Sequence, residues 1–320
     1  MASKVDETRD GVDLTNLDQP LFDGAEATKR DLVEYLDAVR EWMLPGLRER
    51  PLSVVRIRPG QPAFMQKNLP KYTPEWVRRT QVWAEASKRE ISYALCDDRR
   101  TLLWFANQRA VEYHPALMLD HRMTHLVLDL DPPEGDDTFA KAVQGAFLVR
   151  QALADAGLNG AVKTSGAKGV HVIVPIDATV AVDDAAAATR AIAARAERID
   201  PEVATTAYIK EDRYGKVFVD STRAGGATLV AAYSPRIRPG TPVSFPVGWD
   251  DLDRVSPRDF TVKTAVELLS GVDRWASQLP EPQSLPEDLL EEGRAIPIAR
   301  VVAMHEGKRR KRAQREAEGS

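Results

Sequence analysis

The stretch THLVLDLDPP, residues 124–133, places Asp129 and Asp131 at the end of an apolar run. Such a run predicts a strand, and side chains at positions i and i+2 of a strand point to the same face. Pro132 and Pro133 then end the pairing with neighbouring strands. Two carboxylates held side by side repel each other unless a cation lies between them, and Mg²⁺ and Mn²⁺ prefer carboxylate oxygen. The stretch therefore predicts a strand that ends in a pair of metal-binding aspartates.

The composition of the 320 residues is typical of a globular protein, with 43% hydrophobic and 29% charged residues. No apolar run reaches the roughly 18 residues that a membrane-spanning helix needs, and the N-terminal MASKVDETRDG is too polar for a signal peptide. Cys96 is the only cysteine, so we expect a buried thiol in a reducing cytoplasm.

The charge distribution limits the ways in which the chain could bind nucleic acid. A net charge of −4 argues against a protein that coats nucleic acid by charge alone, but it permits a local basic groove. The basic run KRRKR at 308–312 has two interpretations, a solvated tail or a nonspecific phosphate contact.

Hydrophobic periodicity and capping signals predict alternating helices and strands. Thr28 is the expected N-cap of a helix at 29–43, while Asp137 caps and Gly157 ends a helix at 138–156. Other helices are expected at 183–198, at 261–270, from Thr73-Pro74, and from Thr101 to near His114. The expected strands are 52–58, 91–97, 161–164, 170–176, 216–220, 227–233 and 242–247. Residues 1–20 are expected to form an extended arm, and the pattern favours an α+β fold with antiparallel pairing.

Two further segments bring reactive side chains to the ends of strands. In the turn SGAKG, residues 165–169, Ser165 and Lys168 are placed as in an anion-binding turn, and His171 follows in the next strand. The strand KVFVD delivers Asp220 at its exit. Three carboxylates are what a two-metal site needs to activate an attacking oxygen and stabilise a leaving pyrophosphate.

Each of these features also has a structural interpretation. An aspartate at a strand end is often a solvated turn former, and glycine-rich turns are common. A lone histidine in an apolar strand is often a core residue with satisfied hydrogen bonds. The presence of all three features on successive strands favours the functional interpretation.

The motifs LDLDPPEG, KTSGAKGVHVIVP and VFVDSTR…AAYSPRIRPG, in this order, resemble the polymerase domain of bacterial DNA ligase D. That domain belongs to the archaeo-eukaryotic primase-like polymerases. The stretches TNLDQPLF, RPLSVVRIRPG, AFMQKNLPKYTPEW and LLWFANQRAVEYHP are also similar to it. The resemblance covers roughly residues 12–270.

The resemblance implies a role for each matching residue. Asp129, Asp131 and Asp220 would be the catalytic ligands of two Mn²⁺ or Mg²⁺ ions. Ser165, Lys168 and His171 would contact the triphosphate, and Arg213 and Arg236 would contact the nucleotide and active-site phosphates. Phe64 would stack on the base, with Lys67 beside it, and His114 would lie near the sugar. Lys29 would bind a downstream DNA 5′-phosphate.

The resemblance also implies a fold and a function. The fold would be α+β, with a primase-like (RRM-like) antiparallel catalytic sheet flanked by helices and packed with an N-terminal α/β subdomain. The expected divisions are 1–115, 116–275 and a wrapping arm with a basic tail at 276–320. The protein would be a monomeric, nucleoid-associated bacterial polymerase that adds NTPs or dNTPs, with a ribonucleotide bias, to fill short gaps in DNA repair. Because the chain has no K-x-D-G ligase motif, we expect it to stand alone and to need a separate DNA ligase in trans.

The chain departs from the family pattern at four places. Gln19 stands where the family has the first lysine that grips the 5′-phosphate, and Arg223 stands where it has a glutamine. Phe64-Met65 replaces a pair of aromatic residues, and the segment between Val82 and Ile91 looks short for a loop that bridges broken ends. These departures favour gap filling over end synapsis.

Two other functions fit parts of the pattern. Haloacid-dehalogenase-type phosphatases also have a DxD motif after an apolar strand, which would make Asp129 a nucleophile. That motif expects Thr or Val at the position of Pro133, so the sequence disfavours it. The other alternative is a non-catalytic protein that binds DNA ends, against which the three carboxylates argue, because unpaired buried acids are costly.

Overall fold

The stretch that ends in the two aspartates is strand β10, His125–Asp131, in a computed structural model that describes residues 4–58, 60–84, 88–224 and 227–298. The chain groups into two compact units, each made of three segments. One unit comprises Met1–His121, Ala161–Lys168 and Gly226–Leu279, and the other comprises Arg122–Gly160, Gly169–Gly225 and Pro280–Ser320. The division of the sequence at 115 and 275 remains a prediction about subdomains.

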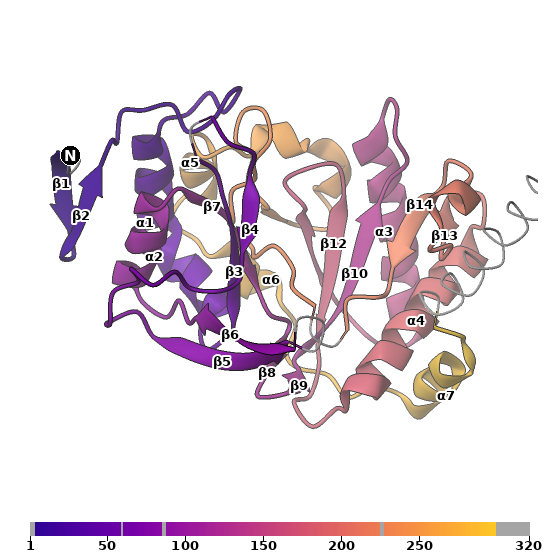
Figure 1. Ribbon diagram of the computed structural model, residues 1–320. Helices are drawn as coiled ribbons and strands as arrows, with labels where there is room; N and C mark the ends of the chain where they lie inside the picture. The colour runs from indigo at the N-terminus through magenta and orange to yellow at the C-terminus, as the bar shows by residue number, and fades with distance from the viewer. Residues whose placement is uncertain (1–3, 59, 85–87, 225–226, 299–320) are drawn as a thin grey trace, which may run out of the picture. The chain divides into compact units, whose positions relative to one another are not determined.

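In the second unit, β10 is the central strand of an antiparallel group that carries the aspartates (Figure 1). Its neighbours are β12, Val170–Pro175, and β14, Val217–Asp220. Strand β13, Ala204–Thr205, runs parallel to β14, and β9 covers Arg122–Met123. All six residues of β12 are buried, which fits a sequence that is apolar except for His171 and does not alternate.

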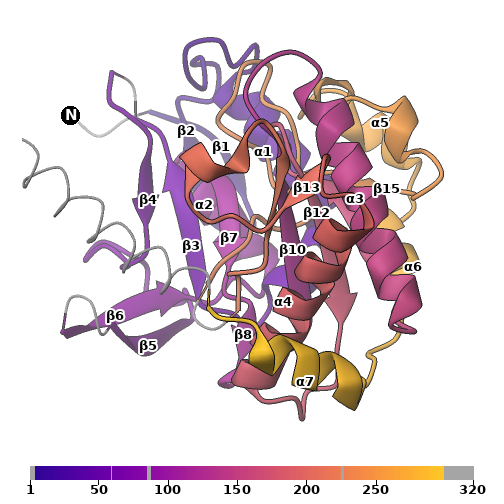
Figure 2. The same cartoon turned by 90° about the vertical axis from the view of Figure 1, so that its right-hand side faces the viewer.

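Helices α3, Thr138–Asp155, and α4, Val182–Ile199, pack on these strands and on each other (Figure 2). Gly145 of α3 lies against β14, where an added Cβ would stand 2.9 Å from Val217 Cγ1. The alanine-rich face of α4 receives α7, Glu287–Ala295, so closely that a Cβ at Gly293 would meet the carbonyl oxygen of a residue in α4. Small side chains thus set the spacing of this layer.

In the first unit, a capping box begins the longest helix. Thr28 accepts a hydrogen bond from the Asp31 amide, and the Asp31 carboxylate accepts one from the Thr28 amide. The helix, α1, covers Lys29–Leu47, and its apolar residues Leu32, Val33, Leu36 and Val39 are buried. It packs on α2, Arg99–Asn107.

The sheet of the first unit surrounds strand β3. Its strands are β3 Leu52–Arg56, β4 Phe64–Gln66, β5 Arg79–Ala84, β6 Arg89–Ala94 and β7 Ala110–Pro115. β3 pairs antiparallel with β4, β6 and β7, and β5 pairs with β6. The unit also contains β8 Met118–Leu119, β11 Ala161–Thr164, β15 Pro246–Val247, α5 Ala265–Leu269 and α6 Arg274–Gln278, of which β11 pairs with β15.

The mixed α/β fold with antiparallel strands is confirmed, as are the main predicted elements around the aspartates. Cys96 is buried and free, as expected. Among the residues that the structure describes, no helix is long and apolar enough to cross a membrane. The basic run at 308–312 lies outside the described residues.

Several predicted boundaries in the first unit are wrong. Thr73-Pro74 opens a turn, not a helix: the Val77 amide donates to the Pro74 carbonyl at 3.1 Å, and β5 begins at Arg79. The helix expected to reach His114 ends at Asn107, since Arg109 adopts a left-handed φ of 57° and the following residues form β7.

The N-terminal segment is more regular than the predicted arm. It forms a hairpin of β1, Val5–Arg9, and β2, Val12–Thr15. Asp10 and Gly11 both have positive φ, which suits the turn of a two-residue hairpin. The Asp-Gly pair was therefore the missed signal.

Three further predictions are corrected. Asp137 precedes α3 but makes no capping hydrogen bond, because its own backbone is left-handed. The strands expected at 227–233 and 242–247 reduce to isolated bridges and the short β15, where Pro242 and Pro246 cannot donate. The helix expected at 261–270 is only the five residues of α5, and α7 is an unpredicted helix in the arm after 280.

We predict that Gly145→Ala destabilises the protein by about 1–3 kcal/mol, because the added methyl group overpacks α3 against Val217. Chemical denaturation would measure the change. The matched control is Gly46→Ala in α1, where an added Cβ meets nothing within 4 Å. There alanine should be neutral or stabilising by up to ~1 kcal/mol, and equal losses at both positions would contradict the packing argument.

Candidate active site

Strand register brings three predicted site residues into one row. Asp129 of β10 lies directly opposite His171 of β12 on one side and Asp220 of β14 on the other. Opposite residues of antiparallel strands project to the same face. The His171 Nε2 lies 3.3 Å from Asp129 Oδ1. The row therefore follows from the backbone pairing itself.

Asp131 completes a group of three carboxylates. It lies two residues beyond Asp129, and one oxygen from each of Asp129, Asp131 and Asp220 lies within 4.8 Å of the others. Asp129 and Asp220 are buried. Closely spaced carboxylate oxygens are the donor set that Mg²⁺ and Mn²⁺ take, so these residues fit the divalent metal that the sequence predicts.

The electrostatics of the three carboxylates are unequal. Burial raises the pKa of Asp129, but the neighbouring His171 and Arg223 outweigh it and hold that pKa well below its usual range. Burial and then the charges of Asp129 and Asp220 raise the pKa of Asp131 to about 6. Without a cation, the group therefore resists carrying three negative charges.

Arg223 is the site residue whose contacts the sequence did not reveal. Its Nη2 donates to Asp129 Oδ2 at 2.7 Å, and its Nε lies 3.3 Å from Asp220 Oδ2. The other oxygen of Asp220 accepts from the amide and hydroxyl of Thr222, at 2.8 and 2.6 Å. A basic residue three positions after Asp220 was visible as a departure from the family pattern, but strand periodicity does not extend to it.

The glycine-rich turn fits its position for two steric reasons. A Cβ at Gly169 would stand 2.4 Å from the Leu130 carbonyl oxygen, so only glycine permits this approach to β10. Gly166 has a φ of 68°, and a Cβ there would stand 2.7 Å from Arg236 Cγ. The exposed Lys168 lies between these two glycines in the sequence.

A buried glutamate connects several predicted nucleotide contacts in the first unit. Glu112 bonds to His114 Nε2 at 2.9 Å and to the Ile237 amide at 2.9 Å, and it lies 3.2 Å from Arg236 Nε. Arg236 in turn donates to the Ser165 carbonyl. Burial raises the pKa of Glu112, but these partners together lower it to about 2. Glu112 was not predicted, although its position two residues before His114 puts both side chains on one face of β7.

Other predicted contacts lie in separate surroundings. Phe64 is half-buried, with the Arg58 guanidinium 5.1 Å from its ring centre, and Lys67 is exposed. In the second unit, the Arg213 guanidinium stacks 3.8 Å from the Phe218 ring centre and donates to the Ala207 carbonyl.

Lys29, the predicted ligand of a DNA 5′-phosphate, is almost completely buried. Its ammonium donates to the Thr15 carbonyl at 2.5 Å and to Asn107 Oδ1 at 2.6 Å. Burial and then the charge of Arg109 lower the pKa of Lys29 to about 8. Arg109 also donates to the Gln19 side chain at 2.9 Å, and both residues line a cavity of about 670 Å³.

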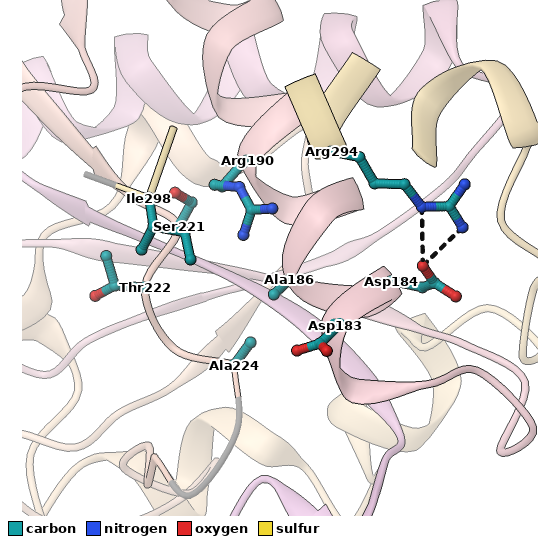
Figure 3. Close-up of a pocket in the computed structure, with 9 residues that line it drawn as sticks. All are labelled: Asp183, Asp184, Ala186, Arg190, Ser221, Thr222, Ala224, Arg294 and Ile298. Carbon is teal, nitrogen blue, oxygen red and sulfur yellow. Dashed lines mark hydrogen bonds and ion pairs between the residues drawn. The ribbon is translucent and has the colours of Figure 1, made fainter. Parts of the chain in front are cut away.

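A second cavity lies beside the segment that follows Asp220 (Figure 3). It measures about 600 Å³ and is lined by Asp183, Asp184, Ala186, Arg190, Ser221, Thr222, Ala224, Arg294 and Ile298. Arg294 pairs with Asp184 at 2.8 Å, and Arg190 donates to the Gly293 carbonyl. None of the predicted site residues lines this cavity.

Comparison with known proteins confirms the resemblance. A family model described as "LigD, primase-polymerase domain" matches residues 28–275. The chain is 32% identical over 262 residues to the bifunctional non-homologous end joining protein LigD of Bacillus subtilis, covering 80% of this chain and 42% of that protein. It is 34% identical over 277 residues to the multifunctional non-homologous end joining DNA repair protein LigD of Mycobacterium tuberculosis, covering 82% of this chain and 36% of that protein. The chain thus spans less than half the length of these relatives.

A solved structure shows the same fold. The polymerase domain from Mycobacterium tuberculosis ligase D, in complex with DNA, matches with a TM-score of 0.75 and 32% identity. The match covers 84% of this chain and 97% of that domain.

We predict that divalent metal binds more weakly as the pH falls below 6. The pKa of about 6 at Asp131 means that a proton competes with the cation there, so affinity should drop by up to about tenfold per pH unit below that value. Well above pH 6 this group is fully ionised and should add no further change. Titration calorimetry with Mn²⁺ between pH 5 and 8 would measure the profile. Asp131→Asn should bind metal more weakly and lose the slope, and an unchanged slope would contradict the assignment to Asp131.

Proposed function

The chain belongs to the LigD primase-polymerase domain family, a family of nucleotidyltransferases, and we propose that it extends a DNA primer by template-directed nucleotidyl transfer. The observation that carries the proposal is the row of His171, Asp129 and Asp220, with Asp131 beside it. Three carboxylates at the end of adjacent strands suit a reaction in which a triphosphate brings several negative charges to one place.

Asp129, Asp131 and Asp220 would hold two divalent cations, Mn²⁺ or Mg²⁺. When bound, such ions lower the pKa of an attacking hydroxyl and neutralise the charge of a leaving pyrophosphate. The protein itself positions the carboxylates by strand pairing and orients His171 through its contact with Asp129. His171 would donate to a phosphate oxygen of the incoming nucleotide.

We assign the other nucleotide contacts from the family resemblance, and the chemistry of each side chain supports the assignment. Ser165, Lys168, Arg213 and Arg236 would bind phosphates, since cations and hydroxyls suit phosphate oxygens. Phe64 would stack on the base, with Lys67 beside it, and stacking tolerates any base.

His114 would lie at the sugar and sense a ribose 2′-OH. Glu112 supports this assignment because its bond to His114 Nε2 limits the ring to one orientation. A ring held in this way can distinguish a hydroxyl from a hydrogen, because a hydrogen bond depends on geometry. A bias to NTPs over dNTPs would follow.

The DNA substrate would be a short gap in break or excision repair, closed afterwards by a separate ligase. The similar solved structure, from Mycobacterium tuberculosis ligase D, is a polymerase domain in complex with DNA. In this chain Gln19 is neutral and bonds to Arg109, and the Lys29 ammonium is already bonded to two oxygens. Both features support weak recognition of a 5′-phosphate.

The phosphatase alternative is disfavoured because the family match covers residues 28–275 and includes all three carboxylates. Asp129 is also held by Arg223 and His171, which reduces its value as a nucleophile. A non-catalytic DNA-binding protein would bind DNA but would not extend a primer.

We predict that Asp129→Ala or Asp131→Ala lowers primer extension by on the order of a thousandfold, because charge stabilisation at the phosphates is lost. DNA binding, measured by fluorescence anisotropy, should change little. Asp136→Ala, at an exposed aspartate, is the matched control and should keep full activity. Normal extension by either active-site variant would refute the proposed function.

We predict similar extension on gapped duplexes with and without a downstream 5′-phosphate. The reason is that Gln19 carries no charge and Lys29 is buried. The rates should be compared for NTP against dNTP and for Mn²⁺ against Mg²⁺ in the same assay. A strong requirement for the 5′-phosphate would show instead that Lys29 or another cation becomes available when DNA binds.

A further inference from the structure

Arg223 occupies the place between two of the three carboxylates. Its guanidinium is 2.7 Å from Asp129 Oδ2 and 3.3 Å from Asp220 Oδ2, and 35% of its side chain is exposed. A planar guanidinium offers several N–H donors in a fork that suits two acceptors at once. Arg223 therefore holds both buried carboxylates with a single positive charge.

The remaining oxygens of these carboxylates are also engaged. Asp129 Oδ1 faces His171 at 3.3 Å, and Asp220 Oδ1 accepts two hydrogen bonds from Thr222. A divalent cation that binds Asp129 and Asp220 must therefore replace existing contacts. The cation would most directly replace the Arg223 guanidinium at Asp129 Oδ2 and Asp220 Oδ2, because both of these carboxylates are buried.

We propose that Arg223 is an internal counter-ion that competes with a divalent cation for Asp129 and Asp220 and must leave them before metal binds. This inference rests on the proposed metal-binding role of the three aspartates. The partly exposed side chain of Arg223 has a route towards solvent. One positive charge against three carboxylates still leaves an excess of negative charge, so metal binding remains favourable but weaker than at a site without the arginine.

The competition has a consequence for the order of events. Arg223 stabilises the metal-free protein, which would otherwise bury two unpaired carboxylates. A triphosphate that arrives with metal offers the displaced guanidinium new anionic oxygens. Metal and nucleotide would then favour each other's binding, because the same side chain opposes metal in the absence of nucleotide.

The test compares Mn²⁺ binding to the wild type, Arg223→Gln and Arg223→Lys by titration calorimetry without nucleotide. Loss of the charge should tighten binding by about tenfold or more, and lysine, which keeps the charge but not the fork, should lie between. The melting temperature gives a second readout. Arg223→Gln should melt lower than the wild type without metal, and added Mn²⁺ should raise its melting temperature by a larger increment.

The matched control is Arg190→Gln, because Arg190 lies in the same unit, lines the cavity of Figure 3 and donates to the Gly293 carbonyl. Its melting temperature should fall equally with and without metal, and its Mn²⁺ affinity should stay at the wild-type value. A purely structural role of Arg223 would give the same result as this control.

Unchanged or weaker Mn²⁺ binding by Arg223→Gln would overturn the proposal. If that variant does not fold, Arg223→Lys decides, since binding no tighter than that of the wild type would refute competition. Failure of the metal site itself looks different. In that case the wild type would bind no Mn²⁺, or Asp129→Asn would bind Mn²⁺ with the same affinity as the wild type.

Discussion

Repulsion among three carboxylates is the constraint on which the site depends. Strand pairing forces Asp129 and Asp220 to be opposite each other, and the period of the strand puts Asp131 on the same face. The fold maintains this arrangement with close packing, since a Cβ at Gly145 would crowd the Val217 side chain and one at Gly169 would collide with the Leu130 carbonyl oxygen. The protein thus uses packing to hold charges that would otherwise separate.

The core of the site could be predicted from the sequence because it lies on regular strands. A two-residue period relates Asp129 to Asp131, and an apolar strand that ends in an acid identifies Asp220. The failures lie where regular structure ends. Arg223 follows β14 in an irregular segment, and the left-handed backbone of Arg109 ends a helix that the apolar pattern would have continued to His114. No periodic pattern reports such positions.

Buried polar partners were the other unpredicted feature. Glu112 binds His114 and Arg236, and Lys29 is held by Thr15 and Asn107 from distant parts of the first unit. The family resemblance implied ligand contacts for His114, Arg236 and Lys29, and Glu112 was not predicted. The fold gives each of them protein partners as well, because a buried charge needs such partners. Lys29 is the clearest case, since its assigned DNA contact requires an ammonium that the fold already uses.

The same electrostatic argument links stability to catalysis. Groups of like charge are costly to bury, and Arg223 reduces that cost in the metal-free protein by its contacts with Asp129 and Asp220. The net binding free energy of a cation at these aspartates is therefore reduced by the free energy of the arginine contacts that it replaces. A site that is easier to fold without metal is therefore a site that binds metal less tightly. The balance depends on one side chain, at a position where the family resemblance expects a neutral glutamine.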